Sequence, residues 1–336
     1  MGGRGGQPGD GGAADADGAP GVGGAGGGGR RRGGQVKERL VDTAYAAGWA
    51  GLKHLPEPVA RGLFNVIADV AWRRQGKGVR QLEANLARVH PDADAARLRE
   101  LSRAGMRSYL RYWMESFRLS TWSPERIAGA ITVKNLEQLN EAMAAGRGAV
   151  LALPHMANWD LAGAWIASAG GFPFTTVAER LKPESLFDRF VAYRESLGME
   201  VLALTGSQVS VVGTLARRLR EGKLVCLVGD RDLSEAGIQV DFFGEPTRMP
   251  AGPAALAQRT GAALFPVSLW YDGPLLRAEV HPEVAPSGEG TRQEQAAAMT
   301  QAMADVWAEA IREHSVDWHM LQKLWLADLT PRREAS

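Results

Sequence analysis

The sequence predicts an α/β protein with a mostly parallel central sheet, flanking helices and a helical N-terminal cap. After Ser123-Pro124, short apolar runs of strand length alternate with stretches of helical periodicity, which is typical of a buried parallel sheet. Before that point, residues 37–122 show helical periodicity alone. With 45% hydrophobic and 23% charged residues, the 336-residue chain has enough apolar material for a core. We therefore expect one domain over 37–330, with 37–122 as the cap and 123–330 as the α/β part.

Composition excludes several classes of protein. Residues 1–36 are rich in glycine and poor in large apolar residues, so we expect a disordered tail there. The net charge of +1 argues against nucleic acid as a partner. Cys226 is the only cysteine, which fits a reducing cytosol and leaves no disulfide or cysteine metal site. No apolar run reaches about 18 residues and no signal segment opens the chain, so no transmembrane helix is expected.

The cap is expected to contain three helices. Residues 40–52 place apolar side chains on one face of the first, and Pro56-Glu57-Pro58 opens a second that runs through Val70. Basic residues then surround a glycine-containing turn: Arg73, Arg74, Lys77 and Arg80. The third helix runs from Asp94 to Phe117 and carries an i, i+4 row of Arg103, Arg107 and Arg111 beside aromatic residues. This pattern suits a helix at a membrane interface, although an ordinary amphipathic helix packed on the core is the favoured interpretation.

The α/β part follows in regular alternation. Strands are predicted near 131–134, 149–153, 174–177, 201–204, 224–228, 240–243 and 264–270. Helices are predicted near 136–145, 159–168, 183–197, 209–221, 252–260 and 291–313. Short buried runs separated by helices indicate that most of these strands are parallel.

The stretch Ala149–Asp160 holds the first candidate for chemistry. An apolar strand stops at Pro154 and places His155 in the following turn, where Asn158 can cap a helix that has Asp160 in its first turn. Ligands bind at the carboxyl ends of the strands in open α/β sheets. A histidine at that edge, oriented by a carboxylate, can act as a general base.

Other polar residues follow other strands. Glu179 comes at the end of the strand near 174–177, and Gly229-Asp230-Arg231 comes directly after the strand 224–228. Because parallel strands end at one edge, His155, Glu179 and Asp230 should converge there. Asp230 then competes with Asp160 as the carboxylate that orients His155, and the sequence leaves both open.

Three arginines are candidate ligands for a phosphorylated substrate. Arg194 lies on the helix near 183–197, Arg231 follows Asp230, and Arg248 lies in the segment Asp241–Pro253 that leads into a helix. Guanidinium groups suit phosphate because they offer several donors in a fixed geometry. Nothing in the pattern requires a metal ion.

Together these motifs make the chain recognisable. His155-x-x-x-x-Asp160 and Phe242-Phe-Gly-Glu-Pro-Thr-Arg248 resemble the lysophospholipid acyltransferase superfamily, and within it the branch that includes the bacterial lipid A late acyltransferases. Further shared runs begin at Thr43, Leu153, Thr176, Tyr193, Arg231, Val240 and Asp317. The ordered set spans nearly everything after residue 40, and it is much more specific than the His-x-x-x-x-Asp motif alone.

The resemblance implies transfer of a fatty acyl chain, palmitoyl by expectation, from acyl-CoA or an acyl carrier protein to a hydroxyl of a membrane glycolipid. The implied acceptor is the mannose of phosphatidylinositol mono- or dimannoside, with a lipid A-like or other glycolipid as the alternative. Acyl-CoA would be a co-substrate with no further cofactor. The implied location is the cytoplasmic face of the cell membrane, with the protein peripheral to it.

The resemblance also implies residue roles. His155 matches the catalytic histidine, Arg194 matches an arginine near the thioester, and Asp230 stands where relatives carry a glutamate that acts with the histidine. Because the chain has no Gly-x-Ser-x-Gly elbow, direct transfer without an acyl-enzyme is favoured. A thioesterase and a catalytically idle lipid-binding protein are the competing hypotheses.

Overall fold

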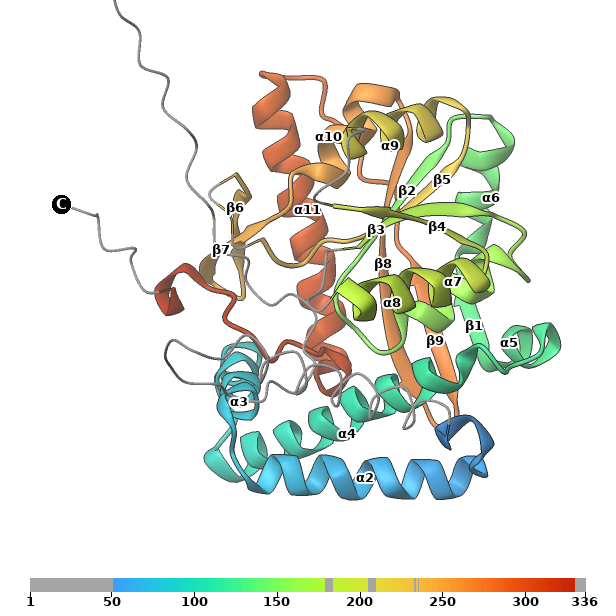
Figure 1. The fold of residues 1–336 in the computed structure, drawn as a ribbon. Coiled ribbons are helices and arrows are strands. Elements are labelled where there is room, and N and C mark those ends of the chain that lie inside the picture. Colours follow the sequence, from blue (N-terminus) through green and yellow to red (C-terminus); the bar gives the residue numbers. More distant parts are fainter. Residues whose placement is uncertain (1–50, 179–183, 205–209, 233, 235, 330–336) are drawn as a thin grey trace, which may run out of the picture.

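The computed structural model describes residues 51–178, 184–204, 210–232, 234 and 236–329. The glycine-rich segment 1–36, nearly all of the expected first helix and Glu179 lie outside these residues. Figure 1 shows a central sheet with helices on both faces and a helical layer against one end.

The expected α/β class with a mostly parallel sheet is confirmed. The main sheet has seven strands in the order β1-β9-β8-β2-β5-β3-β4. Their bounds are Ile131–Lys134, Leu275–Val280, Ala263–Asp272, Ala149–Leu153, Leu224–Val228, Phe174–Ala178 and Met199–Ala203, in that spatial order. β8, β2, β5, β3 and β4 are parallel, and β9 runs antiparallel to β8. The carboxyl ends of β2 and β5 therefore lie side by side, with Leu153 opposite Val228.

Two strands were not expected from the sequence. β9 alternates buried and half-buried side chains in the pattern of a strand, but it follows the turn at Gly273-Pro274 without an intervening helix. β7, Glu245–Met249, contains Pro246 and pairs only with β6, Ile238–Phe242, in a separate two-stranded hairpin. Phe243 and Gly244 form the turn of that hairpin with φ values of 58° and 80°.

Helices cover both faces of the sheet (Figure 1). α6, Leu136–Ala144, and α7, Trp159–Ala167, pack on one face. α9, Val211–Arg220, α10, Gly252–Thr260, and α11, Arg292–Glu313, pack on the other. α8, Glu184–Ser196, packs beside β4, and α5, Pro124–Ala130, leads into β1. None of the described helices is long and apolar enough to cross a bilayer.

The central helix of the cap is α4, Ala95–Leu119, which begins at Asp94 as its N-cap. It lies between α2, Glu57–Arg73, α3, Lys77–Val89, and the α/β part. α3 begins at Lys77, where the sequence suggested a basic turn. The hydrophobic core is continuous from the cap into the sheet.

Of the two interpretations of α4, the amphipathic helix packed on the core is confirmed, and the helix at a membrane interface is not. Met106 and Trp113 are buried, and the arginine row contacts protein groups. Arg103 and Arg107 both bind Asp69 of α2, and Arg111 donates to the carbonyls of Gly273 and Pro274 in the turn between β8 and β9. Since these contacts join α4 to its neighbours, α4 is an amphipathic helix of the core.

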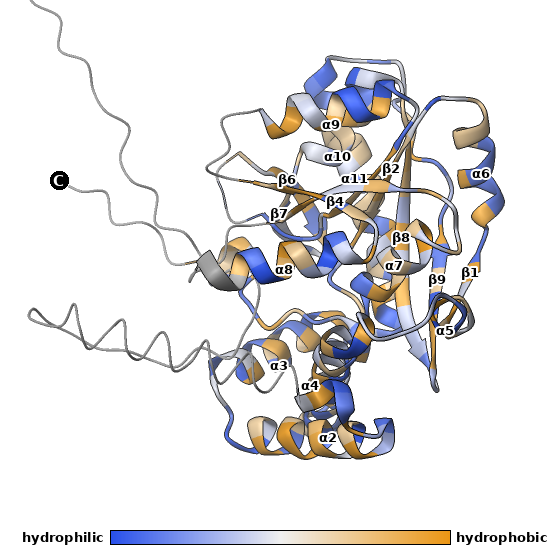
Figure 2. Ribbon diagram, turned by 45° about the vertical axis from the view of Figure 1, so that its right-hand side comes forward, coloured by the Kyte–Doolittle hydropathy of each residue, from blue (hydrophilic) through white to orange (hydrophobic). Residues whose placement is uncertain are grey.

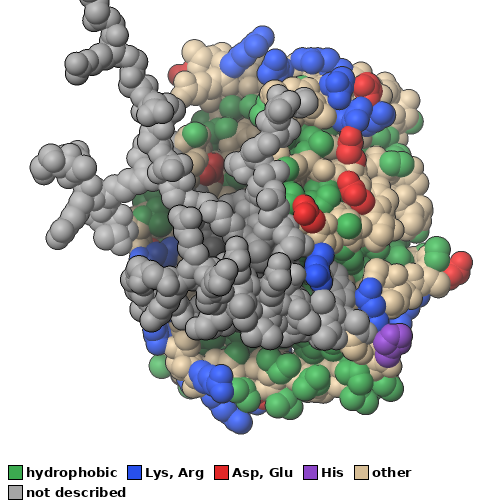
Figure 3. Space-filling model, in the orientation of Figure 1, with side chains coloured by type: hydrophobic (Ala, Val, Ile, Leu, Met, Phe, Trp, Pro, Cys, Tyr) green, Lys and Arg blue, Asp and Glu red, His purple; other side chains and the backbone are tan. Residues whose placement is uncertain are grey.

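It is α2 that presents an apolar face to solvent. Ala60, Phe64 and Ala68 form its buried side. The opposite side exposes a stripe that we call the α2 stripe: Val59, Leu63, Val66, Ile67 and Val70, with exposures of 38–61%. Figure 2 shows apolar residues along α2, and Figure 3 shows hydrophobic side chains gathered along the same edge of the molecule.

Candidate active site

The turn after β2 is the foundation of the site. All five residues of β2 are buried, and the strand ends at Pro154. His155 follows at the carboxyl edge, and Ala157 takes a φ of 46°, which reverses the chain before α7. The side chain of Asn158 accepts a hydrogen bond of 2.9 Å from the Leu161 amide and caps α7. His155 therefore lies in the turn and not in the helix, as the sequence predicts.

His155 and Asp230 form a hydrogen-bonded pair. Asp230 follows β5, the neighbour of β2, and its Oδ1 lies 2.5 Å from His155 Nδ1. Its Oδ2 accepts hydrogen bonds of 3.0 Å from the His155 amide and from Trp318 Nε1. Burial tends to raise the pKa of Asp230, but the charge of His155 and these hydrogen bonds together hold that pKa below its ordinary value. The side chain of His155 keeps 24% of its surface exposed, whereas Asp230 is fully buried.

Asp160 has different partners. Its Oδ1 accepts a 2.9 Å hydrogen bond from Arg194 Nε, and its Oδ2 accepts one of 3.0 Å from the Tyr112 hydroxyl. Asp160 is buried, and Arg194 is nearly so. Of the two carboxylates that the sequence left open, the structure thus pairs Asp230 with the imidazole and Asp160 with the arginine of α8.

A buried carboxylate of the cap supports the turn that carries His155. Glu115 of α4, 3% exposed, accepts hydrogen bonds of 2.9 Å from Asn158 Nδ2 and 3.0 Å from the Tyr271 hydroxyl. Its other oxygen pairs with Arg111 at 2.7 Å. Charged residues are rarely this buried unless paired. The signal for Glu115 in the sequence is weak: it is a single acid between Trp113-Met114 and Phe117.

The segment Asp317–His319 also contacts the turn, and sequence reasoning assigned it no role. The Asp317 carbonyl accepts from the Ala157 amide at 2.8 Å, and the His319 amide donates to the His155 carbonyl at 2.8 Å. The segment Asp317–His319 is far from β2 in the sequence, so their proximity in the fold could not be inferred from it. The only signal was the run Asp317-Trp-His itself, which puts three groups capable of hydrogen bonding side by side.

His319 is held neutral beside the pair. Its Nε2 lies 3.0 Å from Ser108 Oγ, whose hydroxyl donates to Asp317 Oδ1 at 2.5 Å, so Ser108 accepts from His319. Burial, and secondarily the charge of His155, lowers the pKa of His319 to about 3. The ring therefore adds no positive charge near His155 at neutral pH.

Two cavities meet at Trp159. The larger is apolar and lies under α7 on the sheet, lined by side chains of β2, β3, β4 and β5 together with Asp160 and Arg194. The smaller is lined by His155, Arg231 and His319 and by aromatic residues of α4. Trp159 lines both. Among the described residues, those of the cap line the smaller cavity and none of them lines the larger.

The remaining predicted residues are dispersed. Arg231 shares the smaller cavity with His155. Arg248 lines neither cavity and extends toward the Ser234 carbonyl. Glu179 is outside the described residues. Within the described part of the chain, no cluster of three or more His, Cys, Asp or Glu could hold a metal ion.

Comparison with known proteins identifies the class. The chain belongs to the bacterial lipid A biosynthesis acyltransferase family, whose model matches residues 34–327. It is 51% identical over 306 residues to the phosphatidylinositol mannoside acyltransferase of Mycolicibacterium smegmatis, covering 90% of this chain and 96% of the relative. It is 49% identical over 303 residues to the protein of that name from Mycobacterium tuberculosis, covering 89% and 93%. These matches confirm the resemblance seen in the sequence.

The lowered pKa of His319 predicts part of the acid sensitivity of the fold. Between the ordinary value of 6.5 and about 3, the unfolded chain binds a proton at His319 that the folded protein cannot bind. Stability must therefore fall as the pH falls through this range. In His319→Gln the free energy of unfolding should depend less steeply on pH, by up to about 1.4 kcal/mol per pH unit.

Urea unfolding at several pH values between these limits measures the slope. His54→Gln, at an exposed histidine, is the matched control and should keep the wild-type slope. An unchanged slope in His319→Gln would show that His319 takes up protons in the folded protein as readily as in the unfolded chain.

Proposed function

We propose that this protein transfers a fatty acyl chain, palmitoyl by expectation, from acyl-CoA to a mannose hydroxyl of phosphatidylinositol mono- or dimannoside. The observation that carries the proposal is the His155–Asp230 pair, which borders one cavity directly and is separated from an apolar cavity by Trp159. The names of the relatives support the choice of acceptor.

In this mechanism His155 acts as the general base. Its Nδ1 donates to Asp230, so Nε2 is the nitrogen available to take the proton from the sugar hydroxyl. The hydroxyl oxygen attacks the thioester carbonyl, the carbon–sulfur bond breaks, and the proton returns from the imidazole to the thiolate of CoA. Asp230 keeps the ring in the required tautomer and stabilises its charged form.

The two cavities suit the two substrates. The larger is apolar apart from the Asp160–Arg194 pair, which fits an acyl chain with the thioester near Trp159. The smaller brings Arg231, His319 and aromatic rings beside His155, which fits a phosphorylated and hydroxylated ligand. Cys226 lines the apolar cavity, and burial raises the pKa of its thiol, so it is a poor nucleophile and a direct transfer is supported.

The acceptor lies in a membrane, and the α2 stripe supports docking to its cytoplasmic face. Five aliphatic side chains are exposed on one side of α2, and Arg73, Arg74, Lys77 and Arg80 are exposed just after it. An apolar face flanked by basic residues binds the interface of anionic bilayers. The protein would then be peripheral, with α2 as the contact.

The first prediction concerns catalysis. His155→Ala should abolish release of CoA thiol from palmitoyl-CoA in the presence of phosphatidylinositol mannoside, and Asp230→Asn should lower kcat by about 10²–10⁴-fold because the ring loses its orienting partner. Asp160→Asn should act mainly on KM for acyl-CoA, since it releases Arg194. His54→Ala is the exposed control.

The same assay separates the alternatives. Thiol release without an acceptor would indicate a thioesterase, and no release under any condition would indicate an idle lipid-binding protein. Faster transfer to a lipid A-like acceptor than to the mannoside would show that the lipid A-like glycolipid is the preferred acceptor. Full activity in His155→Ala would reject the proposed base.

A second prediction concerns the acyl chain. A Cβ atom at Gly163 would come within 2.7 Å of Met199 Cε and 3.1 Å of Phe174 Cζ, inside the apolar cavity. Gly163→Leu should therefore shift the preferred donor to a shorter acyl-CoA. Gly129 lines neither cavity, and a Cβ atom there would have open space. Gly129→Leu should therefore retain the wild-type preference for chain length. An identical chain-length profile in both variants would place the acyl chain elsewhere.

A third prediction concerns the membrane. Val66→Asp, at the most exposed position of the α2 stripe, should weaken co-sedimentation with anionic vesicles several-fold because it puts a charge into the apolar contact. Val212→Asp on α9, exposed to 54%, is the matched control. Equal binding of both variants would exclude α2 as the docking surface.

A further inference from the structure

Asp230 depends on a donor that belongs to neither β2 nor β5. Its Oδ2 receives the indole N–H of Trp318 at 3.0 Å, and both residues are completely buried. Among the described residues, the other donors to this carboxylate are the ring and amide of His155. Without Trp318, the buried Oδ2 would keep a single hydrogen bond to the protein, from the His155 amide.

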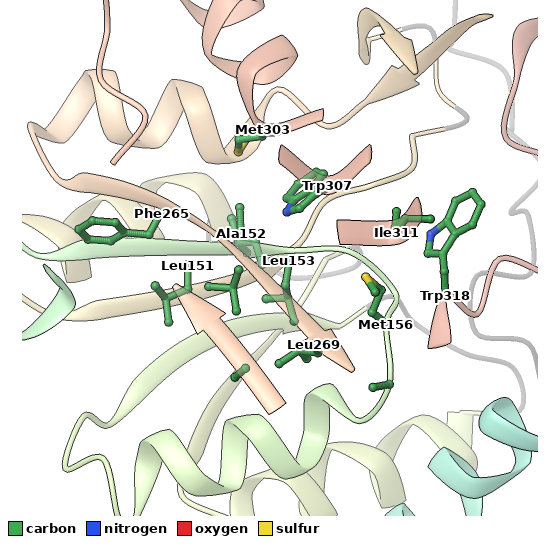
Figure 4. Packing of buried hydrophobic residues seen from close by; sticks show 14 of the residues in the cluster. Leu151, Ala152, Leu153, Met156, Phe265, Leu269, Met303, Trp307, Ile311 and Trp318 are labelled. Carbon is green, nitrogen blue, oxygen red and sulfur yellow. The ribbon is translucent and has the colours of Figure 1, made fainter. Parts of the chain in front are cut away.

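The indole is held in place from two sides. The backbone of Trp318 forms an isolated antiparallel β-bridge with Met156 in the turn after β2. Figure 4 shows the two side chains next to each other. On its other side, its ring lies 6.1 Å from Phe242, 6.2 Å from Phe243 and 6.2 Å from Trp325. These are the distances of packed aromatic pairs.

The hairpin β6–β7 anchors that aromatic cluster. Trp325 Nε1 donates to the Phe242 carbonyl at 2.9 Å, and Thr247 Oγ1 donates to the Leu324 carbonyl at 2.7 Å. Thr247 also forms a bridge with Trp325. The Phe242–Arg248 segment therefore lies behind the candidate dyad, where it fixes the C-terminal chain that carries Trp318.

We infer that Trp318 is a positioning residue: its indole N–H, held by the β6–β7 hairpin, orients Asp230 and sets the acid limb of the pH–rate profile. The inference rests on the proposed function, because it assumes that His155 is the base. It gives the Phe-Phe-Gly-Glu-Pro-Thr-Arg segment a structural part in catalysis without contact to either substrate.

The direction of the effect follows from electrostatics. The indole N–H donates a hydrogen bond to Asp230 and thereby stabilises the negative charge of the carboxylate. When this donor is removed, the carboxylate attracts the protonated imidazole more strongly, so a larger fraction of enzyme carries the inactive, protonated base at a given pH. The acid limb of kcat/KM should therefore move to higher pH.

The test is the pH profile of Trp318→Phe, measured by thiol release from palmitoyl-CoA with phosphatidylinositol mannoside. The acid limb should move upward by roughly half to one pH unit, and kcat/KM near neutrality should fall about tenfold, the usual size for loss of a hydrogen bond to a charged group. Trp72→Phe is the matched control, since it also loses an indole hydrogen bond, to Ser102 Oγ at 2.9 Å, and lies in the cap outside the aromatic cluster. Its limb should stay at the wild-type pH.

Three outcomes overturn the inference: an unmoved limb in Trp318→Phe, a limb moved to lower pH, or equal displacement in both variants, which would assign the effect to packing. If His155→Ala keeps activity, the proposed function itself fails; if His155→Ala is inactive and the limb of Trp318→Phe is unmoved, only the role of Trp318 fails.

If Trp318→Phe does not fold, the wild-type chain still provides a test. In protein with nitrogen-labelled tryptophan, the NMR chemical shift of one indole N–H should change with pH. The midpoint of that change should equal the midpoint of the acid limb. That response should persist in Trp159→Phe, which removes the indole in ring contact with His155, and disappear in His155→Ala. Absence of such a signal in Trp159→Phe would also overturn the inference.

Discussion

The site depends on one buried negative charge. Asp230 has no exposed surface, and an ionised carboxylate in that position is tolerated only when donors surround it. Those donors come from the turn after β2 and from the segment after α11. Parallel pairing of β2 with β5 brings the turn to Asp230, and aromatic packing brings the indole. The sheet order and the course of the C-terminal segment are thus both constrained by the same carboxylate.

α4 performs the corresponding task for the cap. From one helix, Ser108 contacts His319 and Asp317, Tyr112 contacts Asp160, and Glu115 contacts Asn158. These contacts reach the turn, the first turn of α7 and the C-terminal segment. The cap is consequently part of the framework of the site and not an appendage to the sheet. Another helix of the cap, α2, remains free to present aliphatic side chains outward because its attachment uses Ala60, Phe64, Ala68 and Asp69.

Local pattern accounts for much of this architecture. The bounds of β1, β2, β5 and α10 agree with the sequence prediction to the residue, because each is a distinct apolar or periodic run between clear breakers. The approach of Asp230 to His155 was also predictable, since adjacent parallel strands must end together. By contrast, Pro246 concealed β7, and a tight turn concealed β9.

Contacts set by tertiary packing were beyond sequence reasoning. Trp318 lies 88 residues from Asp230 along the chain, and no periodicity relates them. The distinction between α2 and α4 at the surface failed for a similar reason. Both helices are amphipathic, and only the burial of Met106 and Trp113 and the exposure of the α2 stripe show which of them is enclosed. The shape of the larger cavity likewise depends on Gly163, because a Cβ atom there would meet Met199 and Phe174, and a pattern of apolar residues does not reveal such a close approach.

The late position of Asp317–His319 in the chain has a consequence for biosynthesis. A nascent polypeptide that has already produced β2 and β5 holds both members of the dyad, yet it has neither the indole nor the amide that complete their surroundings. The surroundings of the His155–Asp230 pair can therefore be complete only after translation has passed His319. Until then, Asp230 would lack the donor that Trp318 supplies.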